Sequence, residues 1–368
     1  MLMDLAPRSG ILPAHAIARL YDEGAIISAS PFAPGQIQPA SLDLRLGAHA
    51  YRVRASFLPG RANTVEGRLE ALKLHRISLD GGAVLETGCV YIVPLEEKLA
   101  LPGNIAALSN PKSSTGRLDI FTRVIADRAN EFDKIPAGYA GPLFAEISPR
   151  TFPVLVRPGS RLTQIRFRAG PFEASDSLIR ELHQREPLVT SGEPNIDNGI
   201  ALSVDLASHE AGQPIGYRAI RHSGLIDVDA VGALEVRDYW EPIFRPQSLI
   251  LDPDQFYILA SREAVRVPPD HAAEMVPFNP LMGEFRVHYA GFFDPGFGHA
   301  AGGGEGARAV LEVRSHEVPF ILEHGQIVGR LIYERLTEPP SRVYGQEIGS
   351  NYQRQGLKLS KHFQPFTA

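Results

Sequence analysis

The sequence predicts a mainly β protein with a few short helices, in which one fold occurs twice in tandem. The first observation is an internal repeat, because the stretch 145–167 aligns without a gap with 311–333. The second is the alternation of short apolar runs with turns, in a chain that contains 34 Gly and 30 Pro. The third is the length of 368 residues, which suits two domains that each bury a core.

The repeat preserves residue types as well as spacing. At one constant offset of 166 residues, the matched pairs include Glu146/Glu312, Pro153/Pro319, Gly159/Gly325 and Tyr91/Tyr257. The two copies are therefore expected to form the same elements.

The first predicted domain spans residues 1–170. Apolar residues recur at helical spacing over 13–21, and Gly24 marks a helix end. In the segment 41–47 leucines alternate with Asp43 and Arg45, which is the period of a half-buried strand. From 84 to 170, short β runs broken by Pro and Gly favour a sandwich or barrel.

A helical and polar linker is predicted at 171–198, with its helix over 175–188. The second predicted domain, 199–336, opens with the strand 200–206, which repeats the pattern of the strand at Leu42. The remainder, 337–368, is a polar and irregular tail.

Composition excludes several classes of protein. A net charge of −5 gives no general attraction to nucleic acid or to an anionic membrane, so an anionic ligand needs a local basic pocket. The single Cys89 rules out an intramolecular disulfide and a Cys-rich zinc site. No signal pattern and no apolar run of ~20 residues is found, so we expect a cytoplasmic protein.

The segment 110–117, Asn-Pro-Lys-Ser-Ser-Thr-Gly-Arg, places two cations and three hydroxyls within eight positions. Such a set suits a phosphate chain, although it is not a Walker A loop. The alternative is a solvated turn.

Glu146 and Glu312 each interrupt an apolar strand. Because side chains alternate between the faces of a strand, both could face solvent while their neighbours are buried. The alternative is a carboxyl group aimed into a pocket, where desolvation raises its pKa and prepares it for proton transfer. The segment 294–297, Asp-Pro-Gly-Phe, predicts a turn, and Asp294 at such a turn could also accept a hydrogen bond from a sugar hydroxyl.

Taken together, these segments resemble the dCTP deaminases, which have the dUTPase-like fold. The family pattern contains a Lys/Arg-Ser-Ser-x-x-Arg-Leu segment, an Asp-Pro-Gly-aromatic turn, a strand with a catalytic Glu, and a tail with Tyr and Tyr-x-x-Gln. The chain matches these at 112–118, 294–297, 310–312, Tyr344 and 352–355. The resemblance implies two tandem distorted β-barrel or jelly-roll domains and a tail that closes over substrate.

The two copies depart from the family pattern in different ways. In the first, the insertion 127–135 replaces the plain turn, and the linker follows in place of a tail. In the second, the counterpart of the phosphate segment falls near 276–278, and Leu281 replaces Arg117. Because the family builds its site between neighbouring subunits, the resemblance implies one composite site, with Glu146 as a relic.

The resemblance also implies the role of each site residue. The catalytic group is Glu312, Arg117 and Ser113. The substrate-binding group is Lys112, Ser114, Tyr289, Ala290, Asp294, Tyr344 and Gln355. Backbone groups near 288–290 would read the base edge, while Lys112 and Ser114 would bind phosphate.

The implied activity is hydrolysis of dCTP to dUTP and ammonia, a cleavage of the C–N bond of a cyclic amidine that feeds dUMP and dTTP synthesis. Glu312 would act as general base and then general acid. Mg²⁺ would be bound through the triphosphate, and no catalytic metal is implied. No HxE…PCxxC zinc pattern occurs. The expected partners are dCTP, dTTP as an inhibitor, and further copies of the chain, with neither nucleic acid nor membrane.

Two alternatives remain open. The segment 132–141 resembles the uracil hairpin of dUTPases, so a dUTP diphosphatase or a bifunctional deaminase–diphosphatase is the second enzyme hypothesis. A nucleotide-binding regulator without chemistry is the third.

Overall fold

The computed structural model describes residues 9–171, 174–190, 192–207, 212–244, 247–277, 285–288, 291–315, 317–345 and 356–366. At Pro277 and over 285–288 only the backbone is described. Strands dominate, so the prediction of a mainly β fold is confirmed. The predicted site residues Tyr289, Ala290 and Gln355 lie outside the described residues.

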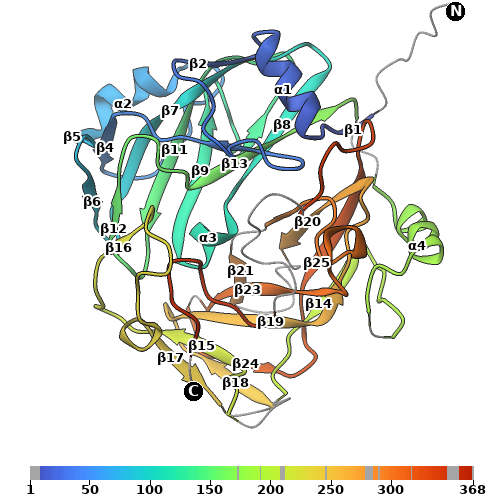
Figure 1. Ribbon diagram of the computed structural model, residues 1–368. Helices are drawn as coiled ribbons and strands as arrows, with labels where there is room; N and C mark the ends of the chain where they lie inside the picture. The colour runs from blue at the N-terminus through green and yellow to red at the C-terminus, as the bar shows by residue number, and fades with distance from the viewer. Residues whose placement is uncertain are drawn as a thin grey trace, which may run out of the picture.

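The first half of the chain forms two sheets and a short ribbon (Figure 1). One sheet has the order β1 (Gly10–Ile11), β13 (Thr163–Ala169), β8 (Ile105–Pro111) and β10 (Lys134–Ile135), and β3 (Leu42–Leu44) also pairs with β13. The other has the order β5 (Lys73–Ser78), β4 (His49–Val53), β7 (Val90–Ala100), β11 (Ala140–Pro149) and β9 (Ile120–Ala126), with β2 (Ile26–Ser28) on β7. The ribbon is β6 (Ala83–Leu85) with β12 (Val154–Val156).

The second half repeats this plan. Its first sheet has the order β14 (Ile200–Ser203), β25 (Ile327–Arg335), β20 (His271–Pro277) and β22 (Phe292–Phe293). Its second has the order β17 (Trp240–Ile243), β15 (Gly216–Ala219), β19 (Phe256–Val265), β23 (Ala307–Ser315) and β21 (Phe285–His288). Its ribbon is β18 (Ser248–Leu251) with β24 (Phe320–Glu323).

Matching contacts confirm the duplication down to single hydrogen bonds. Tyr91 Oη accepts a hydrogen bond from the backbone N–H of Glu86 at 3.1 Å. Its counterpart Tyr257 accepts one from the N–H of Asp252 at 3.0 Å. Both glutamates of the repeat also pair across their sheets with equivalent residues, since Glu146 lies opposite Ile92 and Glu312 opposite Ile258.

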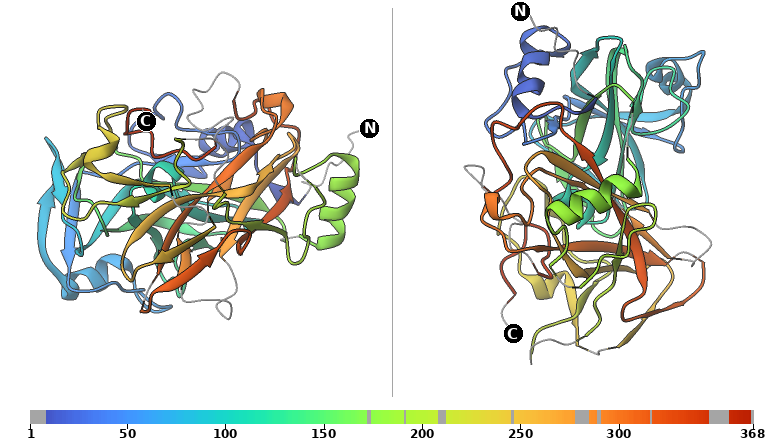
Figure 2. Two further views of the ribbon diagram at one scale, coloured as in Figure 1. Left: turned by 90° about the horizontal axis from the view of Figure 1, so that it is seen from below. Right: turned by 90° about the vertical axis from the view of Figure 1, so that its right-hand side faces the viewer.

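The helices are short, and the two that were predicted are confirmed. Helix α1 (Ala14–Asp22) buries Ile17 and Leu20 against the first half. Helix α4 (Asp176–Arg185) begins after Ser175, whose Oγ accepts from the N–H of Leu178, and it packs on the core of the second half (Figure 2). The others are α2 (Val65–Leu72), α3 (Ser113–Gly116) and the 3₁₀ turns η1 (Val236–Asp238) and η3 (Ala300–Gly302). No helix among the described residues is long and apolar enough to cross a membrane.

The two halves share buried surface. The strand β16 (Ile226–Asp227) of the second half pairs with β12 and so extends the ribbon of the first. Trp240, which is 1% exposed, packs its ring edge-on against Phe152 of the first half, with 5.6 Å between centroids. Burial of aromatic surface on both sides fixes the halves against each other, and α3 lies at their junction (Figure 1).

Candidate active site

The described site residues that sequence reasoning selected all line one cavity of about 370 Å³ at this junction. They come from both halves and from the tail, and they are Lys112, Ser113, Ser114, Arg117, Asp294, Glu312 and Tyr344. The structure therefore brings together groups that are more than two hundred residues apart in the chain.

Glu312 lies on β23 and is 4% exposed, so its side chain does not face solvent. Burial raises its pKa to about 8, and the nearby charge of Arg117 acts in the opposite direction. A carboxyl group with this pKa exchanges a proton readily near neutral pH. The alternative of a solvent-facing position is thus excluded for Glu312, and also for Glu146, which is 1% exposed.

The phosphate segment forms α3, a single helical turn that begins after Lys112. The ammonium group of Lys112 pairs with the carboxylate of Asp43, and Arg161 lies 3.6 Å from the same carboxylate. Lys361 from the tail also lines the cavity. This end of the cavity is therefore cationic, which suits a chain of phosphates.

The Asp294 turn has a short connection to the tail. The N–H of Phe297 donates to the carbonyl of Asp294 at 3.0 Å, with Pro295 and Gly296 at the centre of the turn. Gly296 has φ +89°, and a Cβ atom there would lie 2.8 Å from Val343. Only glycine allows the tail to pass so close to this turn. The Asp294 side chain is 11% exposed, and its carboxylate lies 3.4 Å from the Arg166 guanidinium.

The described end of the tail, 356–366, returns to α3. Arg117 Nη1 donates to the carbonyl of Lys358 at 2.9 Å. Ser360 Oγ donates to the carbonyl of Ser114 at 2.8 Å. His362 Nε2 donates to the carbonyl of Val228 in the second half at 2.9 Å. The tail is thus fastened to both walls of the cavity.

Comparison with known proteins identifies the family of the chain. A family model for the 2′-deoxycytidine 5′-triphosphate deaminase N-terminal domain matches residues 8–171, and the model for its C-terminal domain matches 175–363. The chain belongs to the dCTP deaminase family.

Individual members of the family agree with this assignment. The crystal structure of a 2′-deoxycytidine 5′-triphosphate deaminase from Agrobacterium tumefaciens is similar to this chain with a TM-score of 0.86 and 62% identity, over 89% of this chain and 99% of that one. A "dCTP deaminase, dUMP-forming" of Kocuria rhizophila is 31% identical over 152 residues, which is 41% of this chain and 75% of the relative. A "dCTP deaminase" of Haloarcula marismortui is 31% identical over 134 residues, 36% of this chain and 66% of the relative.

Glu146 is the counterpart of Glu312 in the repeat, but the residues around the two side chains differ. Arg123 on β9 donates to its Oε1 from Nε at 3.1 Å and from Nη2 at 2.6 Å. The Arg123 guanidinium also lies 3.4 Å from the ring centroid of Phe132, which comes from the insertion 127–135. The carboxylate is therefore neutralised by a cation that the insertion covers. Glu146 does not line the cavity of about 370 Å³.

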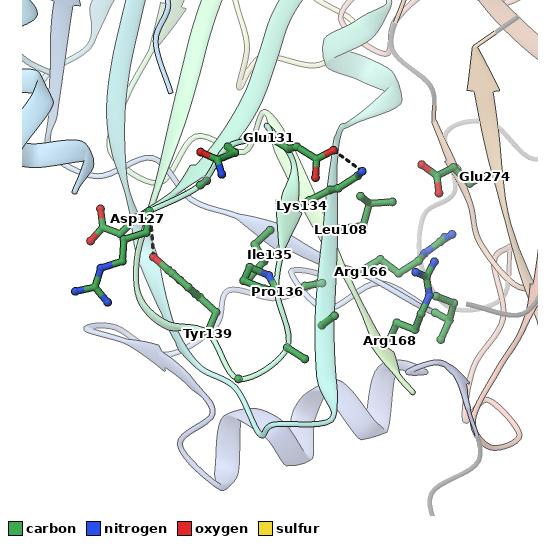
Figure 3. Close-up of a pocket in the computed structure, with 18 of the residues that line it drawn as sticks. Leu108, Asp127, Glu131, Lys134, Ile135, Pro136, Tyr139, Arg166, Arg168 and Glu274 are labelled. Carbon is green, nitrogen blue, oxygen red and sulfur yellow. Dashed lines mark hydrogen bonds and ion pairs between the residues drawn. The ribbon is translucent and has the colours of Figure 1, made fainter. Parts of the chain in front are cut away.

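A larger cavity of about 1060 Å³ is lined by none of the residues predicted for the deaminase site (Figure 3). Residues 134–140 do line it, and they belong to the segment 132–141 that was compared above with the uracil hairpin of dUTPases. Its lining includes positions that the repeat relates to one another, namely Ala106/Ala272, Ala107/Ala273, Leu108/Glu274, Arg166/Ile332 and Arg168/Glu334. Equivalent strands of the two halves thus meet at this cavity. Some charged residues of its wall pair with each other, as Lys134 and Glu131 do at 2.6 Å. We assign it no ligand.

Several residues of the smaller cavity were missed by sequence reasoning. Asp43 pairs with Lys112 and lies 3.6 Å from Arg161, and Lys361 of the tail lines the same cavity. Asp43 lies in the segment 41–47, which was noted only as a strand. No motif signalled Arg161 or Lys361, because only the fold brings them to α3. Among the described residues no group of three His, Cys, Asp or Glu side chains could hold a metal ion.

Proposed function

We propose that the chain hydrolyses dCTP to dUTP and ammonia, with Glu312 as the group that moves the proton. The observation that carries the proposal is a buried glutamic acid with a pKa raised to about 8, on the wall of a cavity whose other end is cationic. A nucleoside triphosphate has the matching polarity, with a neutral base and an anionic tail.

The chemistry assigns two successive roles to Glu312. As a carboxylate it accepts a proton from a water molecule, whose oxygen attacks C4 of cytosine. The resulting carboxylic acid then delivers the proton to N4, so that the C4–N4 bond breaks and ammonia leaves, and the proton of the new C4 hydroxyl moves to N3 to give the keto form of uracil. Arg117 and Ser113 hold the water or the carboxylate in place. This water comes from solvent, so the balance requires no redox partner.

The cationic end of the cavity binds the triphosphate through Lys112, Ser114, Arg161 and Lys361. Mg²⁺ carried by the triphosphate offsets its charge when bound. Asp43 fits such an ion, because it is 2% exposed and its Oδ1 has no hydrogen-bond partner among the described residues. Asp294 and Tyr344 would bind the sugar and close the site. Tyr289, Ala290 and Gln355 belong to the proposed substrate-binding group as well.

The proposal extends to the whole chain. The two sets of sheets would be tandem dUTPase-like jelly-roll domains, 1–170 and 199–336, joined by 171–198 and followed by the tail 337–368. The protein would be a cytoplasmic enzyme of dUMP and dTTP synthesis. We also propose that dTTP inhibits the enzyme and that several copies of the chain assemble.

A second candidate is a bifunctional enzyme that forms dUMP and pyrophosphate. Relatives whose names read "dCTP deaminase, dUMP-forming" favour it, as that of Kocuria rhizophila does.

Product analysis with Mg²⁺ and dCTP tests both enzymatic candidates. We expect one ammonia and one dUTP for each dCTP consumed. Pyrophosphate and dUMP in equal amounts would establish the bifunctional reaction instead. Tight binding of dCTP with no ammonia would contradict both and leave the nucleotide-binding regulator.

A further inference from the structure

A buried ion pair crosses between the halves immediately behind the candidate active site. Arg314 of β23 pairs with the carboxylate of Asp119 in the first half, and the two side chains are 5% and 1% exposed. Thr151 completes the cluster, because its Oγ1 donates to Asp119 at 2.5 Å and accepts from Arg314 at 3.1 Å. None of the three lines the cavity.

Each charged partner is two residues away from a group proposed to act in the reaction. Arg314 follows Glu312 by two positions on β23, so both side chains leave the same face of the strand. Asp119 follows Arg117 by two positions, in the turn that joins α3 to β9. The ion pair therefore links the strand that carries Glu312 to the turn that carries Arg117.

The geometry of that turn is specific. Asp119 has φ +56°, and its N–H donates to the carbonyl of Gly116 at 2.9 Å. Its own carbonyl accepts from the N–H of Arg150 at 3.0 Å. The Asp119 carboxylate is thus held by its backbone on one side and by Arg314 on the other, so it has little freedom to move.

The repeat supplies an internal control. At the offset that relates Glu146 to Glu312, the counterpart of Arg314 is Ser148. A serine cannot form an ion pair. The strand β11, which carries Glu146, therefore lacks this link. The pair accompanies the intact site and is not required by the common fold.

We propose that Arg314 and Asp119 are positioning residues that fix Glu312 relative to Arg117 across the junction of the halves. A buried ion pair adds little net stability compared with apolar residues of similar size, but it is directional. A displacement of about 1 Å at a reacting group is enough to slow a reaction about 100-fold. This inference rests on the proposed function of Glu312.

The test uses the full-length double variant Asp119→Leu with Arg314→Met. Because the double variant leaves no buried charge unpaired, we expect it to fold with a melting temperature close to that of the wild type. We expect kcat for dCTP to fall about 30-fold while KM changes less than threefold. The matched control is Arg168→Met with Glu334→Leu, an ion pair that also joins the halves but lines the larger cavity. It should leave kcat unchanged.

A second readout does not depend on turnover. Infrared titration of ¹³C-glutamate-labelled protein, with Glu312→Gln as the reference, follows the ionisation of Glu312. Loss of the pair moves Glu312 away from the Arg117 charge and should raise its pKa. A wild type that releases no ammonia from dCTP would remove the proposed function, but the titration would still test the pair. Unchanged kcat and unchanged titration in the double variant, or an equal loss of kcat in the control, would overturn the inference.

Discussion

Glu146 and Glu312 occupy equivalent positions on β11 and β23, and both are buried. They differ in the residue that lies opposite them on one neighbouring strand. This residue is Arg123 on β9 for Glu146 and His288 on β21 for Glu312. Arg123 binds the Glu146 carboxylate directly, whereas Glu312 faces a cavity shared with Arg117. Equivalent sheet positions thus hold an arginine-paired glutamate in one half and the proposed proton carrier in the other.

The two glutamates differ in their surroundings and not in residue type or burial. The first copy keeps its glutamate but adds an arginine opposite it and a phenylalanine from the insertion above that arginine. Arg123 thus occupies one oxygen of the Glu146 carboxylate with two hydrogen bonds, and Glu146 does not line the cavity of about 370 Å³. Four predictions would break or sharpen this contrast.

The largest expected effect is on the two glutamates themselves. Glu312→Gln should lower kcat for dCTP deamination about 10³-fold, because the amide cannot shuttle a proton. The matched variant Glu146→Gln should keep kcat within about twofold of the wild type. Ammonia release and dCTP binding are measured for both. The reverse pattern, an inactive Glu146→Gln and an active Glu312→Gln, would exchange the roles of the two copies.

The second prediction concerns Arg123, the arginine of the first copy. Arg123→Met leaves Glu146 buried without its cation, so the free energy of unfolding should fall by about 3 kcal/mol. Denaturation in urea measures this change. The double variant Arg123→Met with Glu146→Leu should recover most of the loss, and both variants should keep the wild-type kcat. Full stability of the single variant would show that Arg123 does not neutralise Glu146.

The third prediction follows from the raised pKa of Glu312. The general base is the carboxylate, so kcat/KM should rise about tenfold per pH unit and level off near pH 8. The same shift affects stability with a defined sign. The folded state holds this proton more tightly than the unfolded state, so wild-type stability should fall relative to Glu312→Gln as pH rises from about 4.5 to about 8. A pH-independent difference in unfolding free energy would contradict the assignment.

The smallest effect is expected from the tail. Lys361→Gln removes one of several cations from the phosphate end, so KM for dCTP should rise about tenfold with little change in kcat. Lys134→Gln, in the larger cavity, is the control and should change neither constant. An unchanged KM for Lys361→Gln would place the triphosphate elsewhere.

The repeat and the strand patterns allowed much of the fold to be predicted, because each depends on local spacing. The positions of α1, α4 and β14 follow from apolar periodicity and caps that the sequence displays directly. The exposure of Glu146 and Glu312 could not be predicted this way. Successive residues are buried along most of β11 and β23, so both faces of each strand are covered.

The site was predictable where its residues form motifs, as in 112–117 and 294–297. Contacts between distant segments were not predictable. Arg161 and Lys361 join Lys112 only through the packing of β13 and the tail. The link between Arg314 and Asp119 required the relative placement of the halves, about which alternation within a strand contains no information.

The return of the tail to α3 has a consequence for the order in which the site is made. Residues 358 and 360, which bind Arg117 and the Ser114 carbonyl, are synthesised after both sets of sheets. A nascent chain can therefore fold its strands while the phosphate segment still lacks these contacts. We expect the cavity to reach its final shape only when translation has passed these residues, so that a ribosome-bound intermediate with folded sheets would not yet hold the nucleotide.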